Sequence, residues 1–294
     1  MKNGICSIVV AMSLLTSSFT FACDIDGKTG FLPDNDMYIS ESDKASNNMT
    51  QERFNQIITR VEKAYAPIVA SKGANFSVIK NWTDGTVNAY ASQNGKTWTV
   101  SMFGGLARHP LVTDDGFMLV VCHETGHHLG GAPKKNVLGG RWASNEGQSD
   151  YFGSMKCMRR VLENDDNIAI VSKMLVDPFV AIKCKSAYTN ENEIALCKRI
   201  AMAGKSLALL LAELGKSKKI SFTTPSKTVV TKTNDNHPDA QCRMDTYLSG
   251  TLCDMSYDQD VDDKDPTVGV CLQRDGHKQG TRPLCWYKPT AQEI

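Results

Sequence analysis

The sequence lacks three features, and each absence excludes a class of protein. After residue 22 no apolar run reaches the roughly 18 residues that a membrane-spanning helix needs, so no spanning segment is expected. There is no block of basic residues and the formal net charge is +1, which argues against nucleic acid and anionic membrane surfaces as partners. No two cysteines have Cys-x-x-Cys spacing, so a zinc site built from paired thiolates is not expected.

Residues 1–22 have the composition of a secretory signal peptide. Lys2 is followed by an apolar stretch from Ile5 to Leu15, and then by Ser- and Thr-rich sequence that ends at Ala22. Export would place the chain in the periplasm or outside the cell, where the environment is oxidising. Cys23 directly follows the expected cleavage point and could carry a lipid anchor, although a lipoprotein signal normally has Leu where Thr20 stands.

The cysteines fit an exported protein. Of the ten in the chain, Cys6 would leave with the signal peptide, and most of the others are expected to form disulfides. The four that follow residue 240 are close in sequence and should pair largely among themselves; they are Cys242, Cys253, Cys271 and Cys285. The sequence does not fix the connectivity.

One motif bears directly on function: His-Glu-x-x-His, inside an apolar run, at His123, Glu124 and His127. Residues four apart lie one above the other on a helix, so both imidazoles can reach a single zinc ion. Glu124 lies beside them, where its carboxylate can accept a proton from an attacking water and pass it to a leaving amine. The motif therefore predicts a zinc hydrolase.

A catalytic zinc usually has three protein ligands, so a third is needed downstream. Pro133 occupies the position of the third histidine in the metzincin pattern, which excludes that arrangement. Glu146 and Asp150 instead share one face of a second helix, which Ser144 or Asn145 should cap. This spacing predicts Glu146 as the third ligand and Asp150 as the acceptor for the free ring N–H of one histidine.

The chain resembles the gluzincin metallopeptidases, which carry His-Glu-x-x-His followed by Glu-x-x-x-Asp on the next helix. The minigluzincins of the HtpX and CAAX-prenyl-protease kind fit best. Three further segments are similar to theirs: Val87-Asn88-Ala89-Tyr90, Gly104-Gly105-Leu106, and the His-Pro-x-x-x-x-Arg pattern from His237 to Arg243. The resemblance covers residues 75–250 and lacks the transmembrane helices of the membrane members. It implies a zincin-like fold and a catalytic His237, which either assists the transition state or caps the metal.

Local patterns predict an α+β domain over residues 23–250, with a small mixed sheet, and a disulfide-rich tail over 251–294. The active-site helix should begin at Thr113 or Asp114 and end at Gly130-Gly131. The remaining expected elements are helices over 48–71, 165–184 and 190–214, strands over 76–79, 87–92 and 96–103, a loop over 216–232, and a short helix after Pro238.

These features predict an exported zinc endopeptidase that hydrolyses peptides or unfolded proteins. Lys96 to Gly104 would be the edge strand to which an extended substrate adds, through main-chain hydrogen bonds. The competing hypothesis is a non-proteolytic envelope chaperone or assembly factor that keeps the zincin fold, and the intact Glu124 argues against it. A disulfide-stapled structural lipoprotein would leave the zinc motif unexplained.

The other candidate residues favour structural roles. His128, His109 and His277 are interpreted as structural or surface histidines. The acidic run from Asp258 to Asp265 suggests a calcium loop, but the turn glycine is missing and Gly269 takes the place of the final Glu, so a solvated loop is favoured. Core packing is expected for Met174, Leu175, Val180, Leu207, Leu210 and Leu211.

Overall fold

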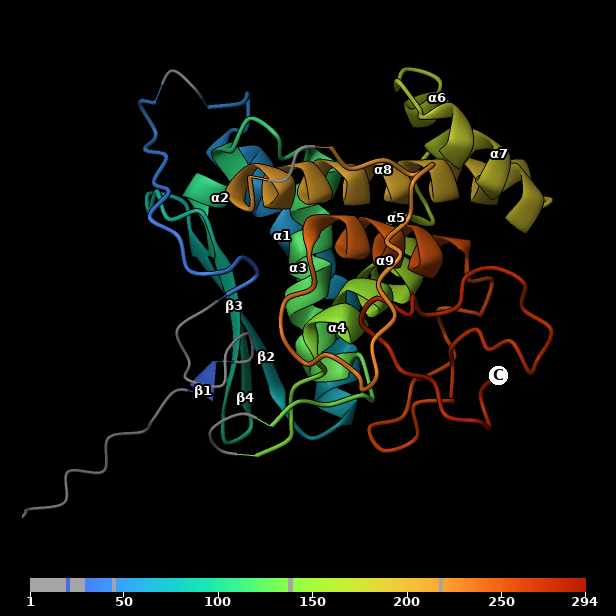
Figure 1. Cartoon of the computed structure of the whole chain (residues 1–294). Helices are drawn as coiled ribbons and strands as arrows, with labels where there is room; N and C mark the ends of the chain where they lie inside the picture. Colours follow the sequence, from blue (N-terminus) through green and yellow to red (C-terminus); the bar gives the residue numbers. More distant parts are fainter. Residues whose placement is uncertain (1–19, 22–29, 44–45, 137–139, 217–218) are drawn as a thin grey trace, which may run out of the picture.

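The computed structural model describes residues 20–21, 30–43, 46–136, 140–216 and 219–294, which form a mixed α+β fold (Figure 1). Nearly all of the expected signal peptide, together with Cys23, lies outside the described residues. Within the described part of the chain, no helix is both long and apolar enough to cross a membrane.

The sheet corrects one expectation. Its strands are β1 (Thr20–Phe21), β2 (Asn75–Asn81), β3 (Ala89–Asn94) and β4 (Thr97–Phe103), in the order β1-β3-β4-β2. β3 and β4 form an antiparallel hairpin, and β2 pairs with β4 in parallel from the other side. The expectation that Lys96 to Gly104 forms an edge strand is therefore wrong, because β4 is hydrogen-bonded on both sides. β3 is also paired on its other side, because β1 joins it in antiparallel register, Thr20 opposite Gln93 and Phe21 opposite Ser92.

Helix caps place the first helices where the sequence predicts them. α1 (Gln51–Ser71) begins after Thr50, whose side chain accepts a hydrogen bond from the amide of Arg53. A short helix, α2 (Gly104–Arg108), then leads to α3 (Asp114–Leu129), which Thr113 caps through the amide of Gly116. α3 packs against α1, α4 and α8, and its residues from Gly116 to Leu129 are all buried.

The second helix of the expected site consists of three consecutive segments. α4 (Glu146–Phe152) is capped by Asn145, whose side chain accepts a hydrogen bond from the amide of Gln148. It continues through a π-helical turn, η1 (Gly153–Cys157), into α5 (Met158–Leu162). The disulfide Cys122–Cys157 ties this turn to α3, so the two helices of the site are covalently joined.

The helix expected over residues 165–184 is two helices, α6 (Asn167–Val171) and α7 (Pro178–Ala187). Pro178 has no amide hydrogen to continue a helix, and Asp177 caps α7 through the amide of Phe179. Leu175 lies in the break and is 95% exposed, so its expected core role is wrong, and Met174 is only half-buried. The other expected core residues are buried: Val180, Leu207, Leu210 and Leu211.

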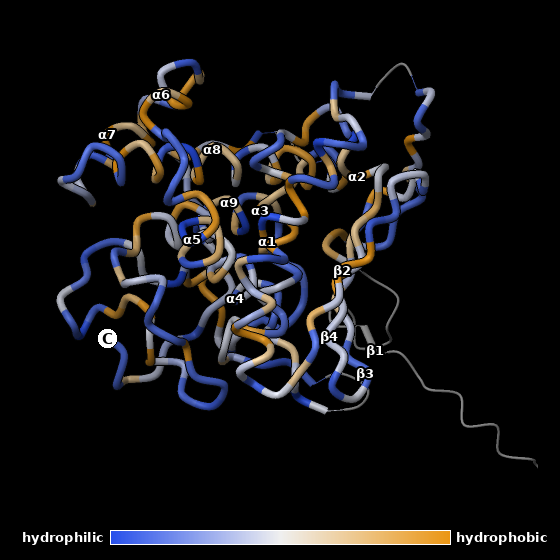
Figure 2. Tube along the Cα trace, turned by 180° about the vertical axis from the view of Figure 1, so that it is seen from behind, coloured by the Kyte–Doolittle hydropathy of each residue, from blue (hydrophilic) through white to orange (hydrophobic). Residues whose placement is uncertain are grey.

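α8 (Glu191–Leu214) and α9 (Ala240–Leu252) lie side by side, and the described residues between them form a loop, as expected. Residues 253–294 contain neither helix nor strand. This tail lies on the side of the molecule away from the sheet (Figure 1). It buries Trp286, Val270 and Leu272 with Tyr151 and Met155 in a separate apolar cluster. In Figure 2 the outer loops, including much of the tail, are mostly hydrophilic, whereas hydrophobic residues concentrate along the strands and helices.

All eight cysteines in the described part of the chain are paired. The bridges are Cys122–Cys157, Cys184–Cys197, Cys242–Cys285 and Cys253–Cys271. The expectation that the four cysteines after residue 240 pair among themselves is confirmed. Disulfides in this number are typical of proteins that mature in an oxidising compartment.

Candidate metal centre

α3 and α4 bring His123, His127 and Glu146 together in the interior. Ligand atoms of the three residues all lie within 4.8 Å of one another, and all three side chains are fully buried. Nε2 of His123 is 3.3 Å from Oε2 of Glu146, and Nε2 of His127 is 3.8 Å from Oε1. Four-residue spacing on α3 supplies the two histidines, and the first residue of α4 supplies the carboxylate.

A glycine inside the motif allows this close approach. A Cβ on Gly126 would lie 3.0 Å from the carbonyl oxygen of Ser149 and 3.1 Å from its Cα. Any larger residue would push α4 away from α3. Gly126 therefore sets the distance between the two helices that carry the ligands.

The Nδ1 atom of each histidine is held by a hydrogen bond. Nδ1 of His123 donates to Asp150 at 2.7 Å, and Nδ1 of His127 donates to the carbonyl oxygen of Ser144 at 2.8 Å. Arg243 in turn donates two hydrogen bonds of 2.7 Å to Asp150. These partners fix the ring orientations, so Nε2 is the nitrogen of each ring that can ligate a metal. The structure shows Asp150 hydrogen-bonded to His123, and its role behind a metal ligand stays a prediction.

Charges around the cluster keep its carboxylates ionised. Burial raises the pKa of Glu146, but Lys135 and His237 outweigh it and hold the pKa well below its usual range. Burial likewise opposes ionisation of Asp150, and Arg243 and His123 together lower its pKa. Burial lowers the pKa of His123, but the carboxylate of Asp150 outweighs it and raises the pKa to about 9, so a metal that binds Nε2 would displace a proton from this ring. For His127 burial dominates and the pKa is lowered.

Glu124 behaves differently from the ligand carboxylate. Burial raises the pKa of Glu124 to about 8, and the negative charge of Glu146 contributes in the same direction. Its side chain is fully buried next to His123 on α3. A carboxyl group whose pKa lies near neutrality can both accept and donate a proton at physiological pH.

Two atoms of the cluster indicate that a metal ion fits it. Nε2 of His123 and Oε2 of Glu146 are buried and lie 3.3 Å apart, but neither makes a hydrogen bond of good geometry with any described residue. Buried polar atoms in native proteins almost always have a partner. Two imidazole nitrogens and a carboxylate oxygen are a donor set that divalent transition metals accept. The cluster could therefore hold a metal ion.

His237 lies at the cluster, where the resemblance implied a functional histidine. Its Nε2 is 3.6 Å from Oε2 of Glu146 and donates a hydrogen bond of 2.8 Å to the carbonyl oxygen of Gly30. His237 lies in the loop before α9, and Arg243 on α9 donates a hydrogen bond to Asp150. The His-Pro-x-x-x-x-Arg segment is therefore part of the site, while the role of His237 in a reaction stays a prediction.

Sequence reasoning missed Lys135. Its ammonium group donates a hydrogen bond of 3.0 Å to Oε1 of Glu146, and both side chains are almost completely buried. A short antiparallel contact between Lys134 and Ser144 folds the loop back to this position. No local pattern marks a lysine in such a loop as a partner of the third ligand.

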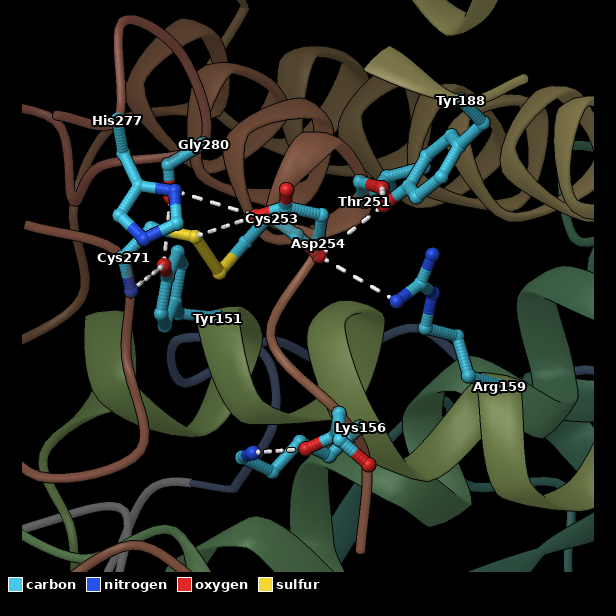
Figure 3. The surroundings of a disulfide bond; sticks show 11 residues. Tyr151, Lys156, Arg159, Tyr188, Thr251, Cys253, Asp254, Cys271, His277 and Gly280 are labelled. Carbon is cyan, nitrogen blue, oxygen red and sulfur yellow. Dashed lines mark hydrogen bonds and ion pairs between the residues drawn. A yellow bond between two sulfur atoms is a disulfide. The ribbon is translucent and has the colours of Figure 1, made fainter. Parts of the chain in front are cut away.

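The remaining histidines lie outside the cluster. His128 is buried and stacked between Trp98 and Trp142, with ring centroids 5.4 and 5.1 Å away. His109 is also buried and lies 3.8 Å from Glu213. His277 lies in the tail beside Asp254 and Cys271, and Figure 3 shows that the sulfur of Cys271 is bonded to Cys253.

The acidic run in the tail pairs partly with basic side chains. Asp258 accepts a hydrogen bond from Arg160, and Asp263 forms an ion pair of 2.7 Å with Lys134. Asp262 and Asp265 accept hydrogen bonds from backbone amides of their own loop. These contacts hold the loop against the rest of the chain.

No protein-family model, curated protein or solved structure matches the chain. The functional inference therefore comes from the site.

Proposed function

We propose that the chain is an exported zinc-dependent endopeptidase of the gluzincin type. The observation that carries the proposal is the position of Glu124, which is buried on the same helical turn as two histidines that converge with Glu146. The resemblance to minigluzincins supports it, and the mixed α+β fold is compatible with a zincin-like domain. The disulfides are in keeping with export.

Zinc is the metal proposed, with His123, His127 and Glu146 as its ligands. Catalytic zinc sites typically combine two or three histidines with one carboxylate and keep a position open for water. When bound there, zinc would lower the pKa of a water molecule towards about 7 and polarise the carbonyl group of a substrate.

Glu124 would carry the proton during hydrolysis. Its carboxylate accepts a proton from the attacking water and then donates it to the amine that leaves as the peptide bond breaks. Burial raises the pKa of Glu124, and the positive charge of a zinc ion beside it would lower the pKa again, which would keep the carboxylate ionised for the first step. Asp150 and Arg243 hold His123 in place, and Ser144 holds His127, so both rings are oriented with Nε2 towards Glu146.

His237 would stabilise the oxyanion that forms when water adds to the carbonyl. Its Nε2–H already donates to a carbonyl oxygen, that of Gly30, close to Glu146. A donor aimed at the developing negative charge lowers the barrier for the addition. The alternative, in which His237 caps the metal, would require Nε2 to leave Gly30.

The substrate proposed is a peptide or an unfolded protein, bound in an extended conformation at the start of β3, beyond the residues that pair with β1. Main-chain hydrogen bonds of this kind do not depend on side chains, so they do not themselves select a sequence. Nucleic acid is not a proposed partner. A lipid anchor at Cys23 remains a prediction.

One observation favours a second candidate, a non-proteolytic envelope assembly factor. All three metal ligands and Glu124 are fully buried, and closed sites are typical of structural metals. In such a protein the metal would stabilise the fold, and Glu124 would not be needed for function.

The variant Glu124→Gln separates the two candidates. The purified chain should bind one zinc, which elemental analysis measures, and should hydrolyse unfolded casein until a chelator removes the metal. Glu124→Gln should retain the zinc and lose turnover by about 10²- to 10⁴-fold. Glu62→Gln, which alters a carboxylate paired with Lys80 away from the cluster, is the matched control. Wild-type turnover in Glu124→Gln, or no zinc in the wild type, would contradict the proposal.

A further inference from the structure

The chain's own N-terminal segment covers the metal centre. Gly30 offers its carbonyl oxygen to Nε2 of His237 at 2.8 Å, and the ring of Phe31 contacts the ring of His123 edge-on, with centroids 5.1 Å apart. Nη1 of Arg243 donates to the carbonyl oxygen of Phe31 at 2.8 Å. Three residues of the centre therefore contact this short segment, His237 and Arg243 at its main chain and His123 at the ring of Phe31.

The same stretch is also bound at the start of β3. The amide of Phe31 donates to the carbonyl oxygen of Ala89, the first residue of β3, at 2.9 Å. The side chain of Asn88 binds Leu32 at both ends, accepting from its amide at 3.0 Å and donating to its carbonyl oxygen at 3.2 Å. These hydrogen bonds involve only the backbone of the segment, so another extended peptide that fits the same space could form them.

The fit is specific at two positions. A Cβ on Gly30 would lie 2.2 Å from the carbonyl oxygen of Ala89 and 2.5 Å from Oδ1 of Asn88, so only glycine can lie this close to the strand. The side chain of Phe31 is fully buried, between His123 and the guanidinium of Arg243, whose Cζ lies 4.4 Å from the ring centroid. The segment therefore presents a glycine followed by a bulky apolar residue.

We propose that Gly30-Phe31-Leu32 is a built-in pseudosubstrate of the peptidase. It occupies the path of a substrate peptide, with the carbonyl group of Gly30 at the oxyanion donor His237. Substrates that replace it carry glycine followed by a large apolar residue, the order found in the segment. The inference rests on the proposed function, since it assigns the same centre a substrate class and a means of inhibition.

Tethering makes the segment an effective competitor. A covalently attached ligand acts at an effective concentration on the order of millimolar, so a free peptide of equal affinity is excluded at lower concentrations. The intact chain should therefore hydrolyse substrates slowly, and any change that displaces the segment should raise the rate.

The variant Gly30→Ala tests this without removing a core side chain. Its added methyl group would collide with the carbonyl oxygen of Ala89 and expel the segment. Hydrolysis of casein by the zinc-loaded variant should rise at least about tenfold over wild type. Gly104→Ala is the matched control, because a Cβ there would lie 1.9 Å from the carbonyl oxygen of Trp82, a contact that does not involve the segment. This control should show no rise.

A binding measurement separates this inference from the proposed function. The probe is a fluorescent peptide, Lys-Thr-Gly-Phe-Leu-Pro-Asp, which has the sequence of residues 28–34. By fluorescence anisotropy it should bind zinc-loaded Glu124→Gln/Gly30→Ala at least about tenfold more tightly than Glu124→Gln alone. Replacing its Phe by Asp should abolish the binding. Selective binding without hydrolysis in any variant would contradict the peptidase, and the segment would then be the displaceable occupant of a peptide-binding site.

The opposite pattern overturns the inference. If wild type and Gly30→Ala hydrolyse casein equally and the peptide binds neither background, the segment is only a structural part of the fold. Should Gly30→Ala fail to fold, Phe31→Ala replaces it, with Phe54→Ala as the control. Both remove a fully buried ring from the same core, but only Phe31 contacts His123. Only Phe31→Ala should then raise the rate, and equal rates would again overturn the inference.

Discussion

The described residues include two groups of potential metal ligands, and although the ligand atoms within each group lie within 4.8 Å of one another, the groups differ in almost every other respect. His123, His127 and Glu146 come from two packed helices and are fully buried. Asp254, Cys271 and His277 come from the tail, where the side chain of Asp254 is 57% exposed and Cys271 is bonded to Cys253 (Figure 3). A disulfide sulfur has no thiolate to offer a metal. Proximity of suitable residue types is thus not sufficient for a metal site.

The two groups differ in the hydrogen bonds that orient the potential ligand side chains. In the helical group both Nδ1 atoms are hydrogen-bonded, to Asp150 and to Ser144, so each ring presents Nε2 to the same point. In the tail group Nδ1 of His277 faces Asp254 at 3.1 Å, and no helix fixes either residue. A metal site requires this second layer of contacts as well as the ligands themselves.

The largest expected effect is on the helical group. Glu146→Gln should weaken zinc binding by more than about 100-fold, because losing a ligand charge costs more than losing an outer partner. The amide keeps the size of the side chain and an oxygen for Lys135. His277→Gln should leave zinc affinity unchanged. Competition with a chromophoric chelator measures both, and the reverse result would assign the zinc to the tail group.

Removing one disulfide near each group tests the same comparison. Cys253→Ser/Cys271→Ser should lower the free energy of unfolding by about 2–4 kcal/mol, measured in urea, while the zinc affinity stays at the wild-type value. Cys122→Ser/Cys157→Ser should lower stability by a similar amount and also weaken zinc binding, because Cys122 precedes His123 on α3. Equal zinc affinity in the two double variants would show that the α3 to η1 bridge does not support the centre.

A smaller effect is expected from the outer partner of His123. Asp150→Asn keeps a hydrogen-bond acceptor for His123 but removes the charge that faces Arg243, so zinc affinity should fall by about 10- to 100-fold. Asp165→Asn is the matched control, because Asp165 also pairs with a buried arginine, Arg199, away from the cluster. A similar loss of zinc affinity in both variants would indicate general destabilisation instead.

Local chemistry explains which parts of the fold and site the sequence could predict. Capping side chains mark the starts of helices, as at Thr113 and Asn145, and four-residue spacing marks a helix face that holds two histidines. The metal ligands and Asp150 follow these local rules, so their positions could be predicted. The break between α6 and α7 also has a local signal, Pro178, but the apolar residues on both sides of it favour a single continuous helix.

The parts that could not be predicted depend on contacts between distant segments. The central position of β4 is set by its parallel pairing with β2, which no turn signal encodes. Lys135 reaches Glu146 only because a loop folds back, and Gly30 meets His237 across most of the chain. Such contacts depend on strand order and on the packing of loops, neither of which leaves a periodic pattern in the sequence.

The smallest expected effect compares adjacent histidines on α3, one in the metal group and one outside it. Burial between Trp98 and Trp142 lowers the pKa of His128 from 6.5 to about 3. The unfolded chain therefore binds one more proton than the folded chain between these values, and stability falls as pH drops through this window. From about pH 7.5 to about pH 5.5 the contribution of His128 is a loss of about 1.4 kcal/mol. His128→Phe keeps an aromatic ring in the stack and removes this contribution. Urea unfolding at both pH values, with a chelator present so that metal release does not contribute, should show a smaller pH-dependent loss in the variant, and an equal loss would contradict the assignment.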